Sequence, residues 1–226
     1  MWTLGLDTST WTASVGATCA GELVAERTRR AARSHALTLI PLIDETLAAA
    51  GIDVTRLSAV AVSNGPGSFT GLRIGLSTAK GLAYAIGARL VAVPSLQALA
   101  RALGPREGLV CPLLDARKGE VYAAVFRWHD GAIEQCGREQ ALSPRQLPGL
   151  VDGPVTFVGD GVDLYQRLLC DLFGERALLV PASNLPPCGG MVARMGWERL
   201  CAGEETSVAS LEPLYVRPSE AELKSG

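Results

Sequence analysis

The sequence contains few of the residues that metal, thiol and nucleophile chemistry require. Its 226 residues include two histidines, His35 and His129, and six cysteines without a C-x-x-C pair. A sulfur-bound zinc needs ligands in close pairs, and a zinc peptidase needs an H-E-x-x-H segment, which is absent. The G-x-S-x-G nucleophile turn and the Walker A loop are absent as well. We therefore predict no metal centre and no catalytic residue, and we expect His35 to be a surface or cap-adjacent side chain.

Long apolar runs are also lacking. No segment reaches the ~20 apolar residues that span a bilayer, and the apolar run at the N-terminus is too short for a signal peptide. Without a secretory signal, the cysteines are not expected to form a disulfide framework. These observations predict a cytoplasmic protein that does not associate with membranes.

Neither sign of charge is in excess. The 21 basic and 23 acidic residues give a net charge of −2. Binding of nucleic acid by this chain alone is disfavoured, because neutralising phosphates needs clustered lysine and arginine. One basic run exists, made of Arg27, Arg29, Arg30 and Arg33. It predicts either solvated side chains or contact with an anionic partner.

The two halves of the chain show the same order of predicted elements. Each half begins with a short apolar strand that ends in an aspartate, Asp7 or Asp115. Further strands and a helix lead to a buried strand, a glycine turn and a second helix. The turns are Asn64-Gly65-Pro66-Gly67 and Gly159-Asp160-Gly161. The repeat predicts a duplicated α/β fold of the actin, Hsp70 and sugar-kinase type, with two similar lobes at residues 1–105 and 106–226.

Several boundaries follow from turn and cap signals. The first half has predicted helices over 34–50 and 70–86, with Ser34 as the N-cap of the first. The second half has a single predicted strand over 120–128, a short helix over 143–150 and a final helix over 187–201. From Glu212 the chain is rich in proline and charge, so about ten terminal residues are expected to be disordered.

The densest candidate motif runs from Gly65 to Gly75, with the sequence GPGSFTGLRIG. A glycine turn that leads into a helix presents free N–H groups and the positive end of the helix dipole, which suits anions. Glycines there also permit a tight turn and close helix packing, so both interpretations stay open. In kinases of this superfamily, aspartates at strand ends handle magnesium and phosphate, although they also cap turns. The candidate nucleotide-binding residues are Asp7, Gly65, Gly67 and Asp115, and a small-molecule phosphotransferase is the alternative function.

Four segments that together span most of the chain resemble the TsaB family. They are Leu6-Asp7-Thr8-Ser9, the run Ser63–Gly75 continued by Ala79–Ala83, Asp115–Tyr122, and Glu212–Arg217. The resemblance implies a non-catalytic scaffold or activator of the complex that forms N6-threonylcarbamoyladenosine in tRNA. It also implies a TsaD-like catalytic subunit and a TsaE-like ATPase as partners, with tRNA contacted only indirectly through the complex. No cofactor is implied, and binding of a nucleotide stays open.

The resemblance also bears on metal binding. TsaD, the catalytic paralogue, holds its metal with an i, i+4 histidine pair, whose rings lie on one helix face. The resemblance places Ser95 and Leu99 at these two positions. Because a leucine side chain cannot bind a metal, the chain is expected to be neither the transferase nor a peptidase. A metallopeptidase is the weaker alternative.

The two helices of the first half carry more apolar surface than one buried side requires. One packed side needs a stripe of about 100° or more, whereas apolar residues cover roughly two-thirds of the first helix. Either both helices lie inside the fold, or a partner covers them; the resemblance implies pairing with TsaD or with a second copy. We expect Leu72 and Leu76 to face outward beside the polar strip from Arg73 to Lys80. The predicted interface residues are Leu37, Ile40, Leu47, Leu72, Leu76, Ala79 and Ala83.

Overall fold

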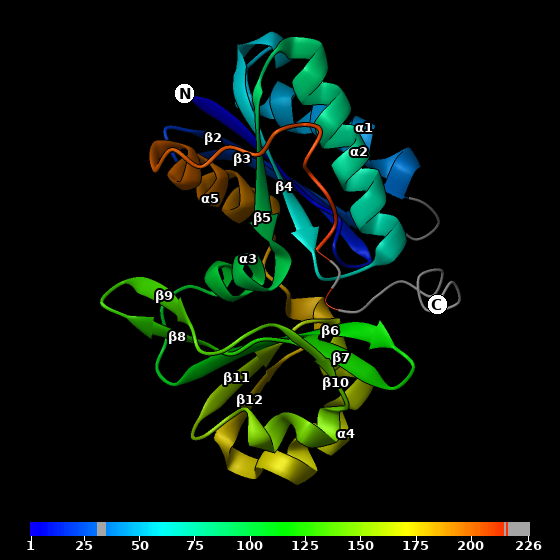
Figure 1. Ribbon diagram of the computed structural model, residues 1–226, viewed down its shortest axis with the longest axis vertical. Helices are drawn as coiled ribbons and strands as arrows, with labels where there is room; N and C mark the ends of the chain where they lie inside the picture. The colour runs from blue at the N-terminus through cyan, green and yellow to red at the C-terminus, as the bar shows by residue number, and fades with distance from the viewer. Residues whose placement is uncertain (31–34, 215, 217–226) are drawn as a thin grey trace. The chain divides into compact units, whose positions relative to one another are not determined.

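A computed structural model describes residues 1–30, 35–214 and 216 (Figure 1). Its contacts divide the chain into two compact units. Unit 1 comprises Met1–Ala98 and Pro187–Pro213, and unit 2 comprises Leu99–Pro186 with Leu214. The chain thus returns to unit 1 at Pro187 and passes to unit 2 again at Leu214.

Unit 1 is built on a five-stranded sheet in the order β3-β2-β1-β4-β5. β1 pairs antiparallel with β2 and parallel with β4, and β4 pairs parallel with β5. The parallel register sets Leu6 beside Val62, so β1 and β4 end at the same edge of the sheet. The strands span Trp2–Asp7 (β1), Thr12–Cys19 (β2), Glu22–Arg30 (β3), Leu57–Gly65 (β4) and Arg89–Pro94 (β5), with a 3-10 turn at Val54–Arg56.

Helices cover both faces of this sheet (Figure 1). α1 (His35–Ala50) and α2 (Phe69–Ile86) lie on one face, and α5 (Gly189–Cys201) lies on the other. Successive strand residues point to opposite faces. Large side chains such as Leu4 and Leu6 therefore pack under α1 and α2, whereas the small Ala61 belongs to the cluster under α5.

Glycines let α5 lie unusually close to the sheet. A Cβ on Gly16 of β2 would collide with the backbone of Gly190, and a Cβ on Gly196 would collide with Ala61. Ser14 Oγ accepts a hydrogen bond from the Gly189 N–H at 2.9 Å, which satisfies a free N–H group at the helix N-terminus. Because these groups need β2 beside them, α5 belongs to unit 1 although it follows unit 2 in the sequence.

Unit 2 has a sheet in the order β10-β7-β6-β11-β12, to which the hairpin β8–β9 adds through β6. α4 packs on this sheet, and Phe173 of α4 meets Phe157 edge to face, with ring centroids 4.8 Å apart. α3 (Ser95–Ala102) connects the two units along the chain. The elements span Leu109–Arg117 (β6), Glu120–Ala123 (β7), Phe126–His129 (β8), Ala132–Gln135 (β9), Gln140–Leu142 (β10), Val155–Val158 (β11), Asp160–Phe173 (α4) and Ala177–Val180 (β12), with 3-10 turns at Pro144–Gly149, Gly174–Arg176 and Ala182–Asn184.

The two sheets have the same strand order, as the duplicated plan predicts. Two predictions differ from the structure. The division at residues 105 and 106 assigned the last helix to the second lobe, whereas its glycine face packs on unit 1. The strand over 120–128 is two strands, β7 and β8, which pair with different parts of β6. The short helix predicted over 143–150 is confirmed as the 3-10 helix Pro144–Gly149.

Some predictions fall outside the described residues. These are the N-cap role of Ser34, the surface position of Arg33 and the disorder of the terminal residues. Within the described residues, none of the helices combines the length and the apolar character that crossing a bilayer requires.

Candidate functional site

The glycine-rich motif forms the connection between β4 and α2. Gly65 ends β4 with a φ of 120°, a conformation that residues with a Cβ rarely adopt. Ser68 is the N-cap of α2, and its Oγ accepts a hydrogen bond from the Gly71 N–H at 3.3 Å. One N–H group that an anion would use is therefore already bonded to a side chain of the protein.

The loop between β1 and β2 packs directly onto the motif. A Cβ on Gly71 or on Gly75 would collide with Thr8, and a Cβ on Gly67 would press against Ser9. Thr8 Oγ1 donates a hydrogen bond to the Gly71 carbonyl at 2.8 Å, and the Ser68 N–H donates to the Ser9 carbonyl at 2.7 Å. The glycines thus serve close packing of the protein's own loop, which was one of the two interpretations of the sequence.

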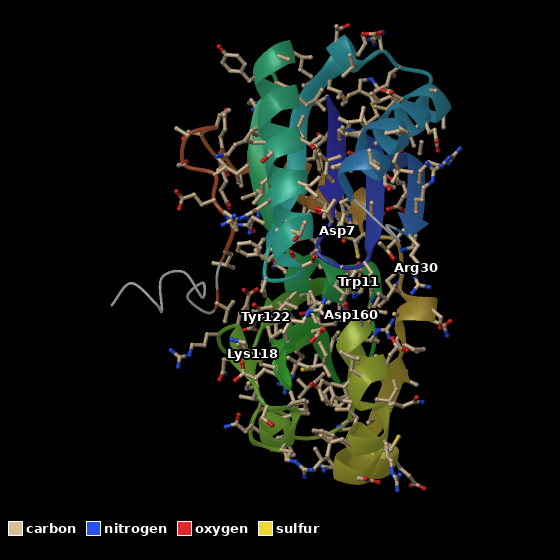
Figure 2. All side chains as sticks on the ribbon, turned by 90° about the vertical axis from the view of Figure 1, so that its right-hand side faces the viewer. Asp7, Trp11, Arg30, Lys118, Tyr122 and Asp160 are labelled. Atoms are coloured by element: carbon tan, nitrogen blue, oxygen red, sulfur yellow. The ribbon has the colours of Figure 1, made fainter. Side chains whose placement is uncertain are left out.

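Asp7 lies at the carboxyl end of β1, beside this loop (Figure 2). Its side chain is buried, and Oδ1 accepts a hydrogen bond from the Ser9 N–H at 3.1 Å. This is the turn-capping role that aspartate often has at the start of a loop. Asp7, Gly65 and Gly67 therefore lie at one edge of the unit 1 sheet.

Asp115 belongs to unit 2 and is held by a different set of bonds. Its Oδ1 accepts a hydrogen bond from the Arg117 N–H at 2.8 Å, and Oδ2 pairs with the Arg117 guanidinium at 3.0 Å. The Asp115 N–H donates to Asp160 Oδ1 at 3.0 Å, at the start of α4 (Figure 2). Burial, with a smaller contribution from the Asp115 charge, raises the pKa of Asp160. Two adjacent carboxylates make this second glycine turn unfavourable for a phosphate.

The predicted interface residues divide into two groups. Leu37 and Ile40 of α1 are 79% and 53% exposed. Leu72 and Leu76 of α2 are 2% and 4% exposed, so the prediction that they face outward is wrong. The other buried members are Leu47, Ala79 and Ala83, which lie in the same core.

The rotation of α2 explains this error. Gly71 and Gly75 must face the β1–β2 loop, and Leu72 and Leu76, one position further along, then turn toward the sheet. The side of α2 that faces solvent instead carries Phe69 and Tyr84, the latter 82% exposed. An aromatic residue on the polar side of a helix was the sequence signal that could have identified Tyr84 as part of this surface.

Three further side chains were assigned from the sequence. Ser95 is buried at the start of α3, and its Oγ accepts a hydrogen bond from the Gly65 N–H at 3.0 Å, so it supports the glycine turn. Leu99 follows on the same helix and has no metal-binding atom. His35 is the first residue of α1 and is only 7% exposed, so of the two expected positions, surface or cap-adjacent, the surface position is wrong.

Comparison with solved structures defines the class of protein. The chain superimposes on a sugar kinase of the ROK family, the hexokinase of Thermus thermophilus, with a TM-score of 0.52 and 13% identity, covering 89% of this chain and all of the hexokinase chain. At this identity the likeness shows the fold alone. The fold is that of the actin, Hsp70 and sugar-kinase superfamily, as the sequence predicted.

Closer relatives identify the family. Residues 23–224 match the family model "TsaD: tRNA N6-adenosine threonylcarbamoyltransferase". The "tRNA threonylcarbamoyladenosine biosynthesis protein TsaB" of Bacillus subtilis is 30% identical over 99% of this chain and 97% of its own length. The structure titled "YeaZ from Pseudomonas aeruginosa" superimposes with a TM-score of 0.79 and 28% identity, over 95% of this chain and 99% of that one. The chain belongs to the TsaB family, within the wider group that the TsaD model describes.

Proposed function

We propose that this chain is a non-catalytic subunit of the complex that forms N6-threonylcarbamoyladenosine in tRNA. It acts with a TsaD-like catalytic subunit and a TsaE-like ATPase, and it contacts tRNA only through that complex. Membership of the TsaB family supports the pathway, because relatives carry the name of a biosynthesis protein for this modification.

The observation that carries the subunit role is an exposed apolar face on the two helices of unit 1. We call it the helical face; it comprises Leu37, Ile40, Phe69 and Tyr84. Leucine and isoleucine exposed to this extent on adjacent turns of one helix are a common feature of protein–protein contacts. Gly81 of α2 has no neighbouring atom at its Cβ position, which leaves room for a second backbone to approach. We infer that the TsaD-like subunit, or a second copy of this chain, covers this face.

The state of the candidate nucleotide residues supports a non-catalytic role. In unit 1 the glycines pack against Thr8 and Ser9. In unit 2 the Asp160 carboxylate accepts a hydrogen bond from the Asp115 N–H, and the Asp115 carboxylate pairs with Arg117. A phosphotransferase would need these groups available for magnesium and phosphate. The leucine at position 99 likewise supplies no metal ligand where the catalytic paralogue has one.

The test replaces Leu37 and Ile40 together by glutamate. Both side chains are exposed, so the variant should keep the thermal stability of the wild type, while a buried charge at the interface should abolish partner binding. The matched control is Leu178→Glu, which changes a leucine of similar exposure on β12 of unit 2.

Both variants replace the chromosomal copy, and two quantities are measured. These are the amount of TsaD-like subunit that co-purifies with the tagged chain, and the threonylcarbamoyladenosine content of tRNA by mass spectrometry. We expect loss of both for Leu37→Glu/Ile40→Glu and neither for Leu178→Glu. Retained binding by the double variant would show that the partner uses another surface. Normal tRNA modification without any binding would contradict the subunit role itself.

A further inference from the structure

One side of α2 carries charged and aromatic side chains in a single row. The row comprises Phe69, Arg73, Ser77, Lys80 and Tyr84, which follow one another at intervals of three or four residues and therefore share one side of the helix. Phe69 and Tyr84 already belong to the helical face, and Arg73 lies between them along the helix. The helical face is thus not purely apolar, since it includes an exposed arginine.

The ring of Phe69 holds the side chain of Arg73. The guanidinium carbon lies 3.9 Å from the ring centroid, and the two residues are one helical turn apart. A cation–π contact of this kind restricts a flexible side chain and uses none of its N–H donors. A restricted side chain loses less conformational entropy when it binds, and the planar fork of N–H groups matches the two oxygens of a carboxylate. The pair is therefore suited to binding a carboxylate that a partner presents.

The two helices of the helical face carry opposite charges. α1 contains Asp44 and Glu45 but no lysine or arginine. α2 contains Arg73 and Lys80 but no aspartate or glutamate. Glu45 pairs with Arg29 of β3 at 2.9 Å, so its charge is balanced within unit 1. An acidic group of a partner is therefore attracted by α2 and repelled by Asp44 of α1, and the charges favour one orientation of the partner.

A carboxylate fits this surface better than a phosphate of nucleic acid does. Leu37 and Ile40 of the adjacent α1 are large exposed apolar side chains, and Asp44 adds a negative charge beside them. Two basic residues next to such a surface are not the cluster of lysine and arginine that neutralises a phosphate backbone. A protein surface with apolar side chains around an acidic group matches both the apolar and the basic parts of the helical face.

We propose that Arg73 is a specificity-determining residue of the helical face and binds a carboxylate of the TsaD-like subunit. The carboxylate lies opposite α2, among apolar side chains that cover Leu37 and Ile40. Phe69 is a positioning residue for this contact, because its ring holds the guanidinium. The inference rests on the proposed function, since that function assigns the helical face to this partner.

The variant Arg73→Gln tests the contact through the affinity for the purified TsaD-like subunit at low and at high salt. Glutamine keeps a polar side chain at this position and removes the charge. We expect the Kd at low salt to rise about tenfold, and to depend less on salt than the Kd of the wild type does. Thermal unfolding of the free chain should be unchanged, because the side chain is exposed.

The matched control is Arg194→Gln on α5. The Arg194 side chain is 54% exposed and pairs with Glu198, which is also four residues away on the same helix. α5 lies on the other face of the unit 1 sheet (Figure 1), so this arginine is outside the helical face. Arg194→Gln should bind the TsaD-like subunit with the affinity and the salt dependence of the wild type.

The variant Arg73→Lys identifies the acidic group. A carbodiimide joins a lysine amine to a carboxylate within ion-pair distance and does not join a guanidinium in this way. We expect position 73 of the variant to become linked to an aspartate or glutamate of the TsaD-like subunit, located by mass spectrometry, and position 73 of the wild type to give no product. Arg194→Lys should become linked only to Glu198 of its own chain, which shows that the reagent is active.

Three results would overturn the proposal. Unchanged affinity and salt dependence in Arg73→Gln would show that Arg73 does not contact a charged group of the partner. A product that links only two copies of this chain would assign the carboxylate to a second copy. Binding of tRNA by the isolated chain that is lost in Arg73→Gln would identify a phosphate as the ligand.

The double variant Leu37→Glu/Ile40→Glu separates this proposal from the proposed function. If it still binds the TsaD-like subunit, the assignment of the helical face to that partner fails. If it loses binding while Arg73→Gln binds like the wild type, the helical face remains the interface and only the role of Arg73 fails.

Discussion

The two units share a strand order but differ in what surrounds their sheets. In unit 1 a pair of α-helices covers one face and α5 covers the other, whereas in unit 2 the helix that corresponds to α1 is replaced by the 3-10 turn Pro144–Gly149. A single helix, α4, follows the glycine turn of unit 2. Only unit 1 therefore has two adjacent helices that can present a common surface. Two units with the same strand order therefore need not have the same binding surface, because that surface is formed by helices outside the sheet.

The glycine turns differ in the same way. In unit 1 the glycines pack against a buried polar loop, Thr8–Thr10, which forms hydrogen bonds with α2 and its N-cap Ser68. In unit 2 the equivalent glycines, Gly159 and Gly161, pack against the backbone and side chain of Leu113. The unit 1 glycines thus pack against a loop, whereas the unit 2 glycines pack against the strand β6, and the Gly159 N–H also donates to the Val180 carbonyl of β12. Four predictions follow from this difference, in order of expected effect.

The largest effect should come from Leu72→Glu, which tests which side of α2 faces the core. The side chain is buried in an apolar cluster, so we expect a loss of about 3–5 kcal/mol in the free energy of unfolding. Ile40→Glu, on the exposed side of the neighbouring helix, should change it by less than about 0.5 kcal/mol. Denaturant unfolding followed by circular dichroism measures both. Equal destabilisation would show that α1 and α2 are both buried.

The seating of α5 on unit 1 is the next most sensitive feature. In Gly16→Ala the added methyl group meets the backbone of Gly190, which cannot move aside as a side chain could. We expect a loss of about 2–3 kcal/mol and faster hydrogen exchange along α5. Gly131→Ala, in a hairpin turn of unit 2 with open space at Cβ, is the control for local backbone effects and should leave α5 protected. An undisturbed α5 in Gly16→Ala would argue against its assignment to unit 1.

A pair of substitutions within α2 should have effects of opposite sign. In Gly75→Ala the methyl group collides with Thr8, and we expect a loss of about 1–3 kcal/mol. In Gly81→Ala nothing lies within reach of the methyl group, and a gain of about 0.5–1 kcal/mol is expected from helix propensity. In Gly161→Ala the added Cβ would lie 3.0 Å from the Leu113 side chain. We expect its effect on the free energy of unfolding to lie between those of the other two variants. Thermal unfolding of the three variants decides whether glycine at position 75 is needed for packing.

The smallest effect concerns Asp160 and depends on pH. Burial and the Asp115 charge raise the pKa of Asp160, so between its ordinary value of 3.8 and the raised value the folded state binds more protons than the unfolded state. Stability contributed by the protonated form is therefore lost as the pH rises through this window. In Asp160→Asn the amide oxygen still accepts the Asp115 N–H, and the charge is absent. We expect the variant to equal or exceed the wild type in stability at neutral pH and to lack this dependence, as measured by unfolding at a series of pH values.

The sequence by itself determined the local elements and the family. Apolar runs that end in an aspartate, glycine turns and helix caps define the strand–turn–helix order, since these signals act over a few residues. The segments around Asp7, Gly65–Gly75 and Asp115 were specific enough to indicate the TsaB family.

Only the tertiary structure decided which side of each helix is buried and to which unit each segment belongs. Apolar residues around most of α2 leave its rotation open, and contact of Gly71 and Gly75 with Thr8 fixes it. The position of α5 depends on Ser14, which lies 175 residues away from the Gly189 that it caps. These features depend on close contacts between segments that are distant in the sequence. The hydrophobic pattern of a single helix does not show which distant segment it will contact.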